Sequence, residues 1–241
     1  FLPRDSARPA VASAARGLYN RCRKMSLSVV WVNFNGLHLL REHFASVVDA
    51  VRSERPDAEF IVVDNGSRDD SLAWLRRHHP QARLLAEGQN RFFAAAANTG
   101  VREARNGLVL LLNPDVHAEQ IRLGDVLARF REDERLFALS PRLTDPRDGC
   151  QEKLFAFRMG RGTVDIIAPP GFSPALERPI PFGTGGALFL RRDVFLELGG
   201  FREIFAPFYW EDTDLGVRAW AAGWRTVYFP ASRFHHFRST L

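Results

Sequence analysis

The sequence has little cysteine, almost no lysine and no long apolar run, and each shortage excludes a class of protein. Among 241 residues only Cys22 and Cys150 are cysteine, too few and too far apart for a disulfide framework or a zinc site. No apolar stretch reaches the roughly 20 residues of a membrane-spanning helix. A reducing compartment is the simpler interpretation, so we expect a cytoplasmic protein. The basic residues are arginine apart from two lysines, which we interpret as a coding bias.

Three widespread nucleotide-binding and hydrolase motifs are also absent. No G-x-G-x-x-G follows the first apolar run, which argues against a nicotinamide or flavin site. No G-x-x-x-x-G-K-[ST] loop exists to cradle phosphates, and no serine stands in a G-x-S-x-G elbow. A bound diphosphate would therefore need positive charge from elsewhere.

The positive charge of the chain is concentrated at its beginning. The net charge is +5 and the pI about 9.8, but residues 1–25 alone hold six basic residues and one acid, and residues 26–241 carry 27 of each sign. The high pI is thus weak evidence for nucleic-acid binding, and we expect none. We interpret residues 1–25 as a solvated basic tail or linker. A short amphipathic helix touching anionic lipid, as a peripheral contact on the inner face of the membrane, is the open alternative.

From residue 26 onward, short apolar runs alternate with segments of helical spacing. Such alternation predicts an α/β fold, with a mainly parallel, doubly wound sheet covered by helices on both faces. The predicted strands are 28–32, 60–63, 82–85 and 108–112, and the helices between them are 37–54, 69–79 and 92–104.

The second half is less regular. We expect Trp220 and Trp224 there to be core residues rather than platforms for sugars. The predicted elements are a helix over 119–133, a strand over 136–139, long loops across 142–182, a strand over 187–190, a helix over 211–222 and a strand over 224–229.

Polar residues stand where the predicted strands end, which is where open parallel sheets bind ligands. Asn33 and Asp64 follow the first two strands, and the turn 113–115 follows the fourth. A carboxylate such as Asp115 is a hard ligand suited to Mg²⁺ or Mn²⁺, which could offset the charge of a diphosphate. Each motif taken alone could equally be a turn or a helix cap.

Two further groups near the end of the chain have open interpretations. Residues 211–214 place three carboxylates in one helical turn, directly after three aromatic residues. The helix dipole favours acids there, but three exceed what capping requires. His235 and His236 are either surface histidines or an imidazole that completes a metal shell.

Five elements in this order resemble the family 2 glycosyltransferases of the GT-A fold, especially bacterial rhamnosyltransferase-like members. They cover most of the chain beyond the tail. The elements are 28–35, 62–67 with Asp69, 90–100, 110–115 in an N-P-D form of the metal motif, and the acceptor-side segment 185–215.

The resemblance implies an inverting, metal-dependent transfer from a nucleotide-diphospho-sugar. Asp115 and His236 would hold Mg²⁺ or Mn²⁺, with His235 as the fallback. Asp212 would be the general base, with Glu211 as the nearest alternative. The resemblance further implies substrate contacts at Asn33, Asn35, Asp64, Asn65, Ser67, Asn90, Asn98, Asn113, Gly185, Gly186 and Trp210.

The family also suggests a domain plan and substrates. Residues 26–116 would be the donor-binding half, and 117–241 the acceptor-binding and catalytic half of the same GT-A domain. The donor would be dTDP-rhamnose or a UDP-hexose. The acceptor would be a hydroxyl of a glycan or of a lipid-linked acceptor in cell-surface polysaccharide synthesis. Family members commonly continue past the histidine, so the resemblance leads us to expect a trimmed domain or part of a larger polypeptide.

Two positions depart from the family pattern, and two other functions compete. Asn113 replaces the first carboxylate of the metal motif, and Phe92 stands where the family usually has glycine. A sugar-nucleotide pyrophosphorylase would need a glycine-rich, basic phosphate loop after the first strand, which 33–36 does not offer. A binding module that has lost catalysis is the other alternative, against which the acidic residues at 115, 211 and 212 argue.

Overall fold

The computed structural model describes residues 26–149, 156–159, 164–167, 173–207 and 209–237. The predicted basic tail and both cysteines lie outside these ranges. Among the described residues, no helix combines the length and apolar character that crossing a bilayer requires.

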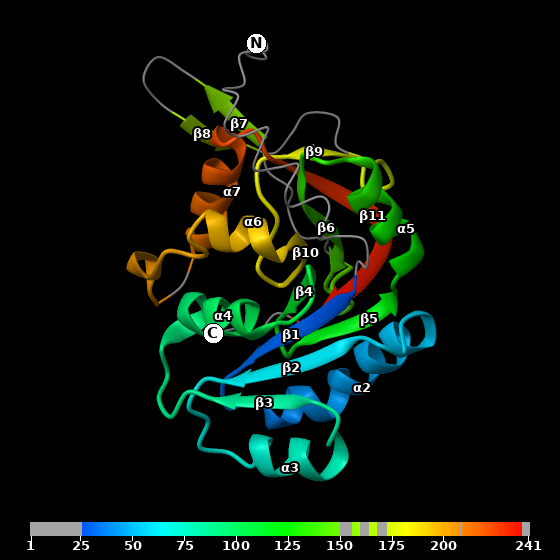
Figure 1. Cartoon of the computed structure of the whole chain (residues 1–241), viewed down its shortest axis with the longest axis vertical. Coiled ribbons are helices and arrows are strands. Elements are labelled where there is room, and N and C mark those ends of the chain that lie inside the picture. Colours follow the sequence, from blue (N-terminus) through cyan, green and yellow to red (C-terminus); the bar gives the residue numbers. More distant parts are fainter. Residues whose placement is uncertain (1–25, 150–155, 160–163, 168–172, 208, 238–241) are drawn as a thin grey trace.

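The first half of the chain builds the parallel part of a central sheet (Figure 1). Apolar, β-branched runs form its strands, as predicted, and β1 lies between β2 and β4 with all three parallel. The edge strand β3 continues the parallel order. The strands are β1 (Leu27–Asn33), β2 (Glu59–Asp64), β3 (Arg83–Ala86) and β4 (Leu108–Leu112).

The second half extends the same sheet with mixed pairing. β10 runs antiparallel between β4 and β6, and β11 runs parallel to β6 and antiparallel to β5 and β9. A separate hairpin joins β7 to β8. The bounds are β5 (Val116–Gln120), β6 (Leu136–Thr144), β7 (Ala156–Met159), β8 (Val164–Ile167), β9 (Arg178–Ile180), β10 (Ala187–Arg191) and β11 (Arg225–His236).

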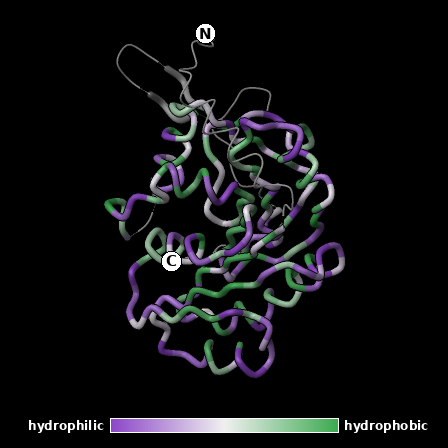
Figure 2. The backbone as a smooth tube through the Cα atoms, viewed as in Figure 1, coloured by the Kyte–Doolittle hydropathy of each residue, from purple (hydrophilic) through white to green (hydrophobic). Residues whose placement is uncertain are grey.

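Helices cover both faces of the sheet, because successive strand residues point to opposite sides. In β1, Val29 and Trp31 join one hydrophobic core with α2, α3 and α5, while Val30 and Val32 join a second core with α4, α6 and α7. Figure 2 shows the apolar segments running along the central strands. The helices are α2 (Leu37–Glu54), α3 (Ser71–His78), α4 (Phe92–Glu103), α5 (Leu123–Glu132), α6 (Arg192–Glu197), η2 (Glu203–Phe205) and α7 (Glu211–Ala221).

Three predictions about the second half are wrong. The helix expected over 119–133 begins only at Leu123, because residues 116–120 form β5 and pair with the last strand. That last strand continues to His236 instead of ending at 229, and strands β7, β8 and β9 lie where we expected long loops. Strands β5, β9 and β11 pair with segments distant in the sequence, of which local spacing carries no sign, whereas β7 and β8 pair with each other as a local hairpin.

The expectation for the tryptophans holds for only one of them. Trp224 packs, half-buried, against the second core. The side chain of Trp220 is 59% exposed on α7 and is therefore not a core residue.

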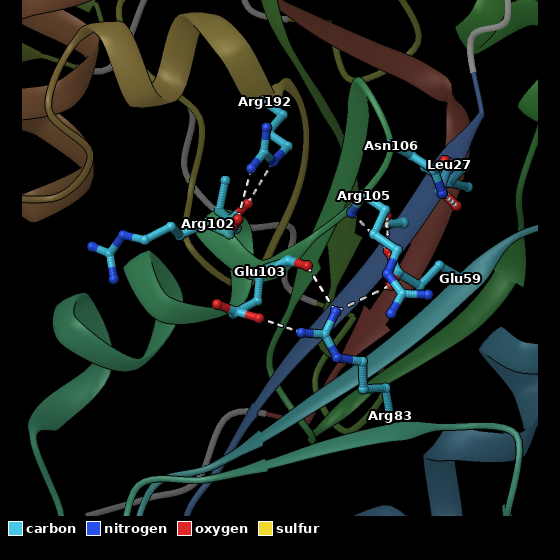
Figure 3. Close-up of polar contacts among 10 residues, drawn as sticks. Leu27, Glu59, Arg83, Arg102, Glu103, Arg105, Asn106 and Arg192 are labelled. Carbon is cyan, nitrogen blue, oxygen red and sulfur yellow. Dashed lines mark hydrogen bonds and ion pairs between the residues drawn. The ribbon is translucent and has the colours of Figure 1, made fainter.

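Ion pairs and hydrogen bonds hold the amino ends of the parallel strands together (Figure 3). Glu59 Oε2 accepts hydrogen bonds from Ser28 Oγ at 2.7 Å and from the Arg105 backbone N–H at 2.9 Å. Arg83 pairs with both Glu59 and Glu103. Arginine at this edge therefore serves the fold, and the predicted site residues lie at the other edge.

Candidate functional site

The carboxyl ends of β1 and β2 carry one connected polar network. Their register places Asn33 opposite Asp64. Asn33 Nδ2 donates to Asp64 Oδ1 at 3.0 Å and to Ser67 Oγ at 3.2 Å, and the Ser67 N–H donates to Asp64 Oδ2 at 3.1 Å. Asn33 and Asp64 are both almost fully buried. The structure thus brings together three residues that the sequence assigned to substrate binding.

Asn35 ties the first loop to the second. It adopts a left-handed backbone with φ 50°. Its N–H donates to Ser67 Oγ at 2.9 Å, and its Oδ1 accepts from the Arg68 N–H at 2.7 Å. The following Gly36 has no room for a side chain, because a Cβ there would lie 2.5 Å from Asn33 Oδ1. The loop is therefore built closely around Asn33.

Asn65 and Asn90 shape the start of α4. Asn65 Nδ2 donates to Asn90 Oδ1 at 2.9 Å and to the Phe92 carbonyl at 3.1 Å, and the Phe92 N–H donates to Asn90 Oδ1 at 2.8 Å. Phe92 has φ 62°, a left-handed conformation that costs a non-glycine residue about 1–2 kcal/mol. The departure from the family's glycine therefore keeps the backbone shape that glycine favours. It also adds a ring that is 41% exposed.

Asn98 lies apart from these loops, inside the molecule. Its Nδ2 donates to the Phe201 carbonyl, and its Oδ1 accepts from the Phe201 N–H, both at 2.8 Å. This pair of bonds fastens α4 to the segment after α6. A contact between Asn98 and the donor stays a prediction.

The turn after β4 meets the end of β11. Asp115 is 8% exposed, and its Oδ1 lies 3.3 Å from His236 Nε2. The Phe237 N–H donates to the Asp115 carbonyl at 3.0 Å. His235 points to the other face of the strand, where its Nδ1 lies 3.1 Å from Thr144 Oγ1. The histidine beside Asp115 is therefore His236 and not His235.

These two side chains suit a divalent cation. Asp115 Oδ1 is buried and accepts no hydrogen bond from the residues that the structure describes. An unused carboxylate oxygen beside an imidazole nitrogen is a ligand pair that Mg²⁺ and especially Mn²⁺ accept. Within the described ranges, no group of three or more His, Cys, Asp or Glu side chains could hold a metal. The protein would therefore supply few ligands to the cation. The side chain of Asn113 is consistent with this, because an amide brings no negative charge to the site.

The predicted glycine pair packs against this turn. The Asn113 N–H donates to the Gly186 carbonyl at 3.0 Å. A Cβ on Gly186 would lie 2.9 Å from His236 Cε1, and one on Gly185 would lie 3.1 Å from the Phe93 ring. The absence of side chains at both positions thus allows the start of β10 to approach His236 and α4 closely.

The acidic residues at the start of α7 fall into two kinds. Asp214 forms ion pairs with Arg218 at 2.7 Å and with Arg202 at 3.4 Å, so it serves the fold. Glu211 is 9% exposed, and burial raises the pKa of its carboxyl, helped by the charge of Asp212. Glu211 and Asp212 are thus the two candidates for a proton acceptor.

Asp212 is half-buried, and its Oδ1 accepts from the Thr213 N–H at 2.6 Å. It borders a small cavity that Phe201 and Leu215 also line. Trp210, just before the helix, is 58% exposed and has φ 75°.

An ion pair that the sequence does not reveal lies just beyond β6. Asp145 is 3% exposed, and the Arg147 side chain binds it through Nε at 2.9 Å and Nη2 at 2.6 Å. These residues lie in the stretch expected to be loop. Their only sequence signal is an acid two positions before an arginine.

Comparisons with known proteins point to one family. A model described as "Glycosyl transferase family 2" matches residues 28–199. The chain is 28% identical to N-acetylglucosaminyl-diphospho-decaprenol L-rhamnosyltransferase of Mycobacterium tuberculosis over 240 residues, covering 88% of this chain and 76% of the relative.

Two solved structures share the fold. GalNAc-T7 with UDP, GalNAc and Mn²⁺ matches with a TM-score of 0.70 and 16% identity, covering 88% of this chain. The chain spans only 44% of that protein. The mannosyltransferase PcManGT from Pyrobaculum calidifontis, in complex with GDP-Man and Mn²⁺, matches with a TM-score of 0.66 and 18% identity, covering 96% of this chain and 68% of that one.

Proposed function

The chain belongs to glycosyl transferase family 2, and from this premise we propose that it transfers rhamnose from dTDP-rhamnose or a hexose from a UDP-hexose, with inversion. As a member of this family it is a glycosyltransferase with the GT-A fold that uses a nucleotide-sugar donor. The choice of donor, the metal and the roles of individual residues are parts of the proposal.

The network at the ends of β1 and β2 supports binding of the nucleotide. Uracil and thymine both present an imide N–H, and the Asp64 carboxylate is an acceptor for it. Asn33 and Ser67 donate to that carboxylate and fix its orientation. Because each carboxylate oxygen has two lone pairs, the base can bind without displacing these partners. Asn35, Asn65 and Asn90 would hold the surrounding loops in shape.

Asp115 and His236 would hold the cation, with the diphosphate of the donor supplying further oxygen ligands. When bound, Mg²⁺ or Mn²⁺ acts as a Lewis acid that lowers the cost of releasing the diphosphate. Two structures of similar fold carry Mn²⁺, which supports the choice of metal. Because Asn113 contributes no charge, we expect the metal to bind weakly without the donor.

Asp212 would act as the general base. A sugar hydroxyl is a poor nucleophile at neutral pH, so a carboxylate within hydrogen-bond reach would take its proton during attack. The acceptor oxygen forms a bond to the anomeric carbon while the bond from that carbon to the diphosphate oxygen breaks. A single displacement of this kind inverts the anomeric centre. Glu211 is the alternative base, since its raised pKa would also make it a stronger proton acceptor.

The acceptor would be a hydroxyl of a glycan or of a lipid-linked acceptor in cell-surface polysaccharide synthesis. The support is the mycobacterial relative, whose name describes an acceptor on diphospho-decaprenol. The exposed Trp210 beside Asp212 would offer an apolar surface to a sugar ring.

The observation that carries the proposal is the placement of the Asn33–Asp64 network and the Asp115–His236 pair at the carboxyl ends of β1, β2 and β4. The test measures release of nucleoside diphosphate from dTDP-rhamnose and UDP-hexoses with Mn²⁺. We expect release that Asp115→Asn and Asp212→Asn abolish and that Asp125→Asn, an exposed acid on α5, leaves unchanged. Binding of a donor without any release would instead identify an inactive binding module.

A further inference from the structure

The Asp145–Arg147 pair is held more firmly than a surface ion pair. Asp145 is 3% exposed, and its two oxygens each accept one hydrogen bond from the Arg147 guanidinium, at 2.9 and 2.6 Å. The Arg147 N–H adds a third bond to Asp145 Oδ1 at 3.1 Å. Bidentate pairing of this kind fixes the orientation of a guanidinium group. The Arg147 side chain is nevertheless half exposed, at 50%.

The strand register brings this pair to the metal turn. β6 and β11 run parallel, with Leu143 opposite Phe234 and Thr144 opposite His235. Asp145, the first residue after β6, therefore follows Thr144 as His236 follows His235, and the His236 imidazole lies 3.3 Å from Asp115. The hydrogen bond with Asp145 raises the pKa of the Arg147 guanidinium, and the charges of Asp148 and Asp115 raise it further. Arg147 thus lies within electrostatic reach of Asp115.

One fixed positive charge at this site would stabilise a bound diphosphate. The chain lacks a phosphate-cradling glycine-rich loop, and Asn113 stands where a second acid would attract the metal. When the sugar leaves, negative charge develops on the terminal phosphate of the nucleoside diphosphate. A guanidinium group matches phosphate oxygens in geometry, and a pre-oriented donor costs little reorganisation during the reaction.

We propose that Arg147 binds the diphosphate of the donor and stabilises it as the leaving group, and that buried Asp145 is the positioning residue that aims it. This inference rests on the proposed function and adds a residue to the same site.

The test compares nucleotides that differ by one phosphate. Calorimetric titration with UDP, UMP, dTDP and dTMP, each with Mn²⁺, is carried out on the wild type, Arg147→Ala and Arg147→Lys. A hydrogen bond to a charged group is worth about 1.5–3 kcal/mol, so we expect Arg147→Ala to weaken diphosphate binding roughly 10- to 100-fold. Monophosphate binding stays unchanged. Arg147→Lys keeps the positive charge but loses the planar pair of N–H donors, so its affinity for diphosphates should lie between those of the wild type and Arg147→Ala.

The matched control is Arg122→Ala, which removes an exposed arginine paired with Asp125 at 3.1 Å, with 54% of its side chain exposed. We expect it to bind all four nucleotides like the wild type. Asp145→Asn should lose part of the diphosphate preference, and adding it to Arg147→Ala should cost nothing more, because it acts through the arginine.

Three results would overturn the inference. Unchanged diphosphate binding in Arg147→Ala would refute it and leave the proposed function intact. Equal weakening of mono- and diphosphates would assign Arg147 a structural role in the loop. If the wild type bound no nucleotide, the proposed function would fail, and the inference with it. Should Arg147→Ala not fold, Arg147→Lys carries the same comparison.

Discussion

Gly186→Ala tests whether the approach of β10 to His236 matters for the metal. The Cβ of alanine would lie 2.9 Å from His236 Cε1 and 3.0 Å from its Nδ1. Ordinary contacts of this kind begin at 3.4 Å, so the imidazole ring must retreat by about half an ångström. The ring stands 3.3 Å from Asp115 Oδ1, and such a shift changes the ligand pair directly.

The expected loss of Mn²⁺ affinity follows from the small range of metal–ligand distances that a metal site tolerates. Metal–ligand distances hold to about 0.2 Å, so a displacement of half an ångström exceeds what a bound cation accepts. We therefore expect Gly186→Ala to weaken Mn²⁺ binding in the presence of UDP or dTDP roughly 10- to 100-fold. The cost in folding stability should be modest, about 1–3 kcal/mol.

The assay is a Mn²⁺ titration followed by electron paramagnetic resonance at saturating nucleotide, with urea unfolding of each variant as a check on folding. Gly107→Ala is the control, because a Cβ at Gly107 meets nothing within 4 Å. Wild-type Mn²⁺ affinity in Gly186→Ala would refute the reasoning that His236 is a ligand held in place by this glycine.

Three further predictions concern the base, the buried acid and the packing of α4. Asp212→Asn should abolish transfer while nucleotide binding by calorimetry survives; equal loss of donor affinity would count against a base. Because burial raises the pKa of Glu211 in the folded state, its ionised form destabilises the fold, and stability is lost as pH rises through the folded pKa. Glu211→Gln should therefore melt higher than the wild type at neutral pH, with the gain vanishing below the ordinary carboxyl pKa of 4.5; a pH-independent difference would contradict this. Gly100→Ala places a Cβ 2.4 Å from Val30 Cγ1 and should cost about 1–3 kcal/mol in urea unfolding. In Gly124→Ala the new Cβ has no contact nearer than 3.9 Å, so the free energy of unfolding should rise by about 0.5–1 kcal/mol. If both substitutions changed the free energy of unfolding in the same direction, the packing argument would be wrong.

Local patterns in the sequence were sufficient where a single segment decides its own structure. The helix predicted over 37–54 matches α2, and the strand over 108–112 matches β4, because apolar spacing and turn residues mark both. The meeting of Asn33 with Asp64 was also predictable, since parallel neighbours end at the same edge of a sheet.

What the sequence left open depends on pairing between distant segments. Residues 116–120 are a strand only because β11 continues past Phe229 to reach them. The same extension turns His236 toward Asp115 and His235 toward Thr144, a choice that two adjacent histidines do not reveal. The position of Arg147 is not predictable from the sequence for a related reason, because only the register of β6 with β11 brings it to the metal turn.

The central claim is that the chain binds a nucleotide-diphospho-sugar through a cation held at Asp115. The most direct measurement is a thermal-shift panel of UDP-, dTDP- and GDP-sugars with and without Mn²⁺ or Mg²⁺, on the wild type and Asp115→Asn. A ligand at 100 times its Kd adds about 2.7 kcal/mol, which raises the melting temperature of a domain of this size by roughly 5–10 °C. We predict such a shift for UDP- or dTDP-sugars, dependent on metal and lost in Asp115→Asn. No shift with any donor, or a shift that neither metal nor Asp115 affects, would contradict the account.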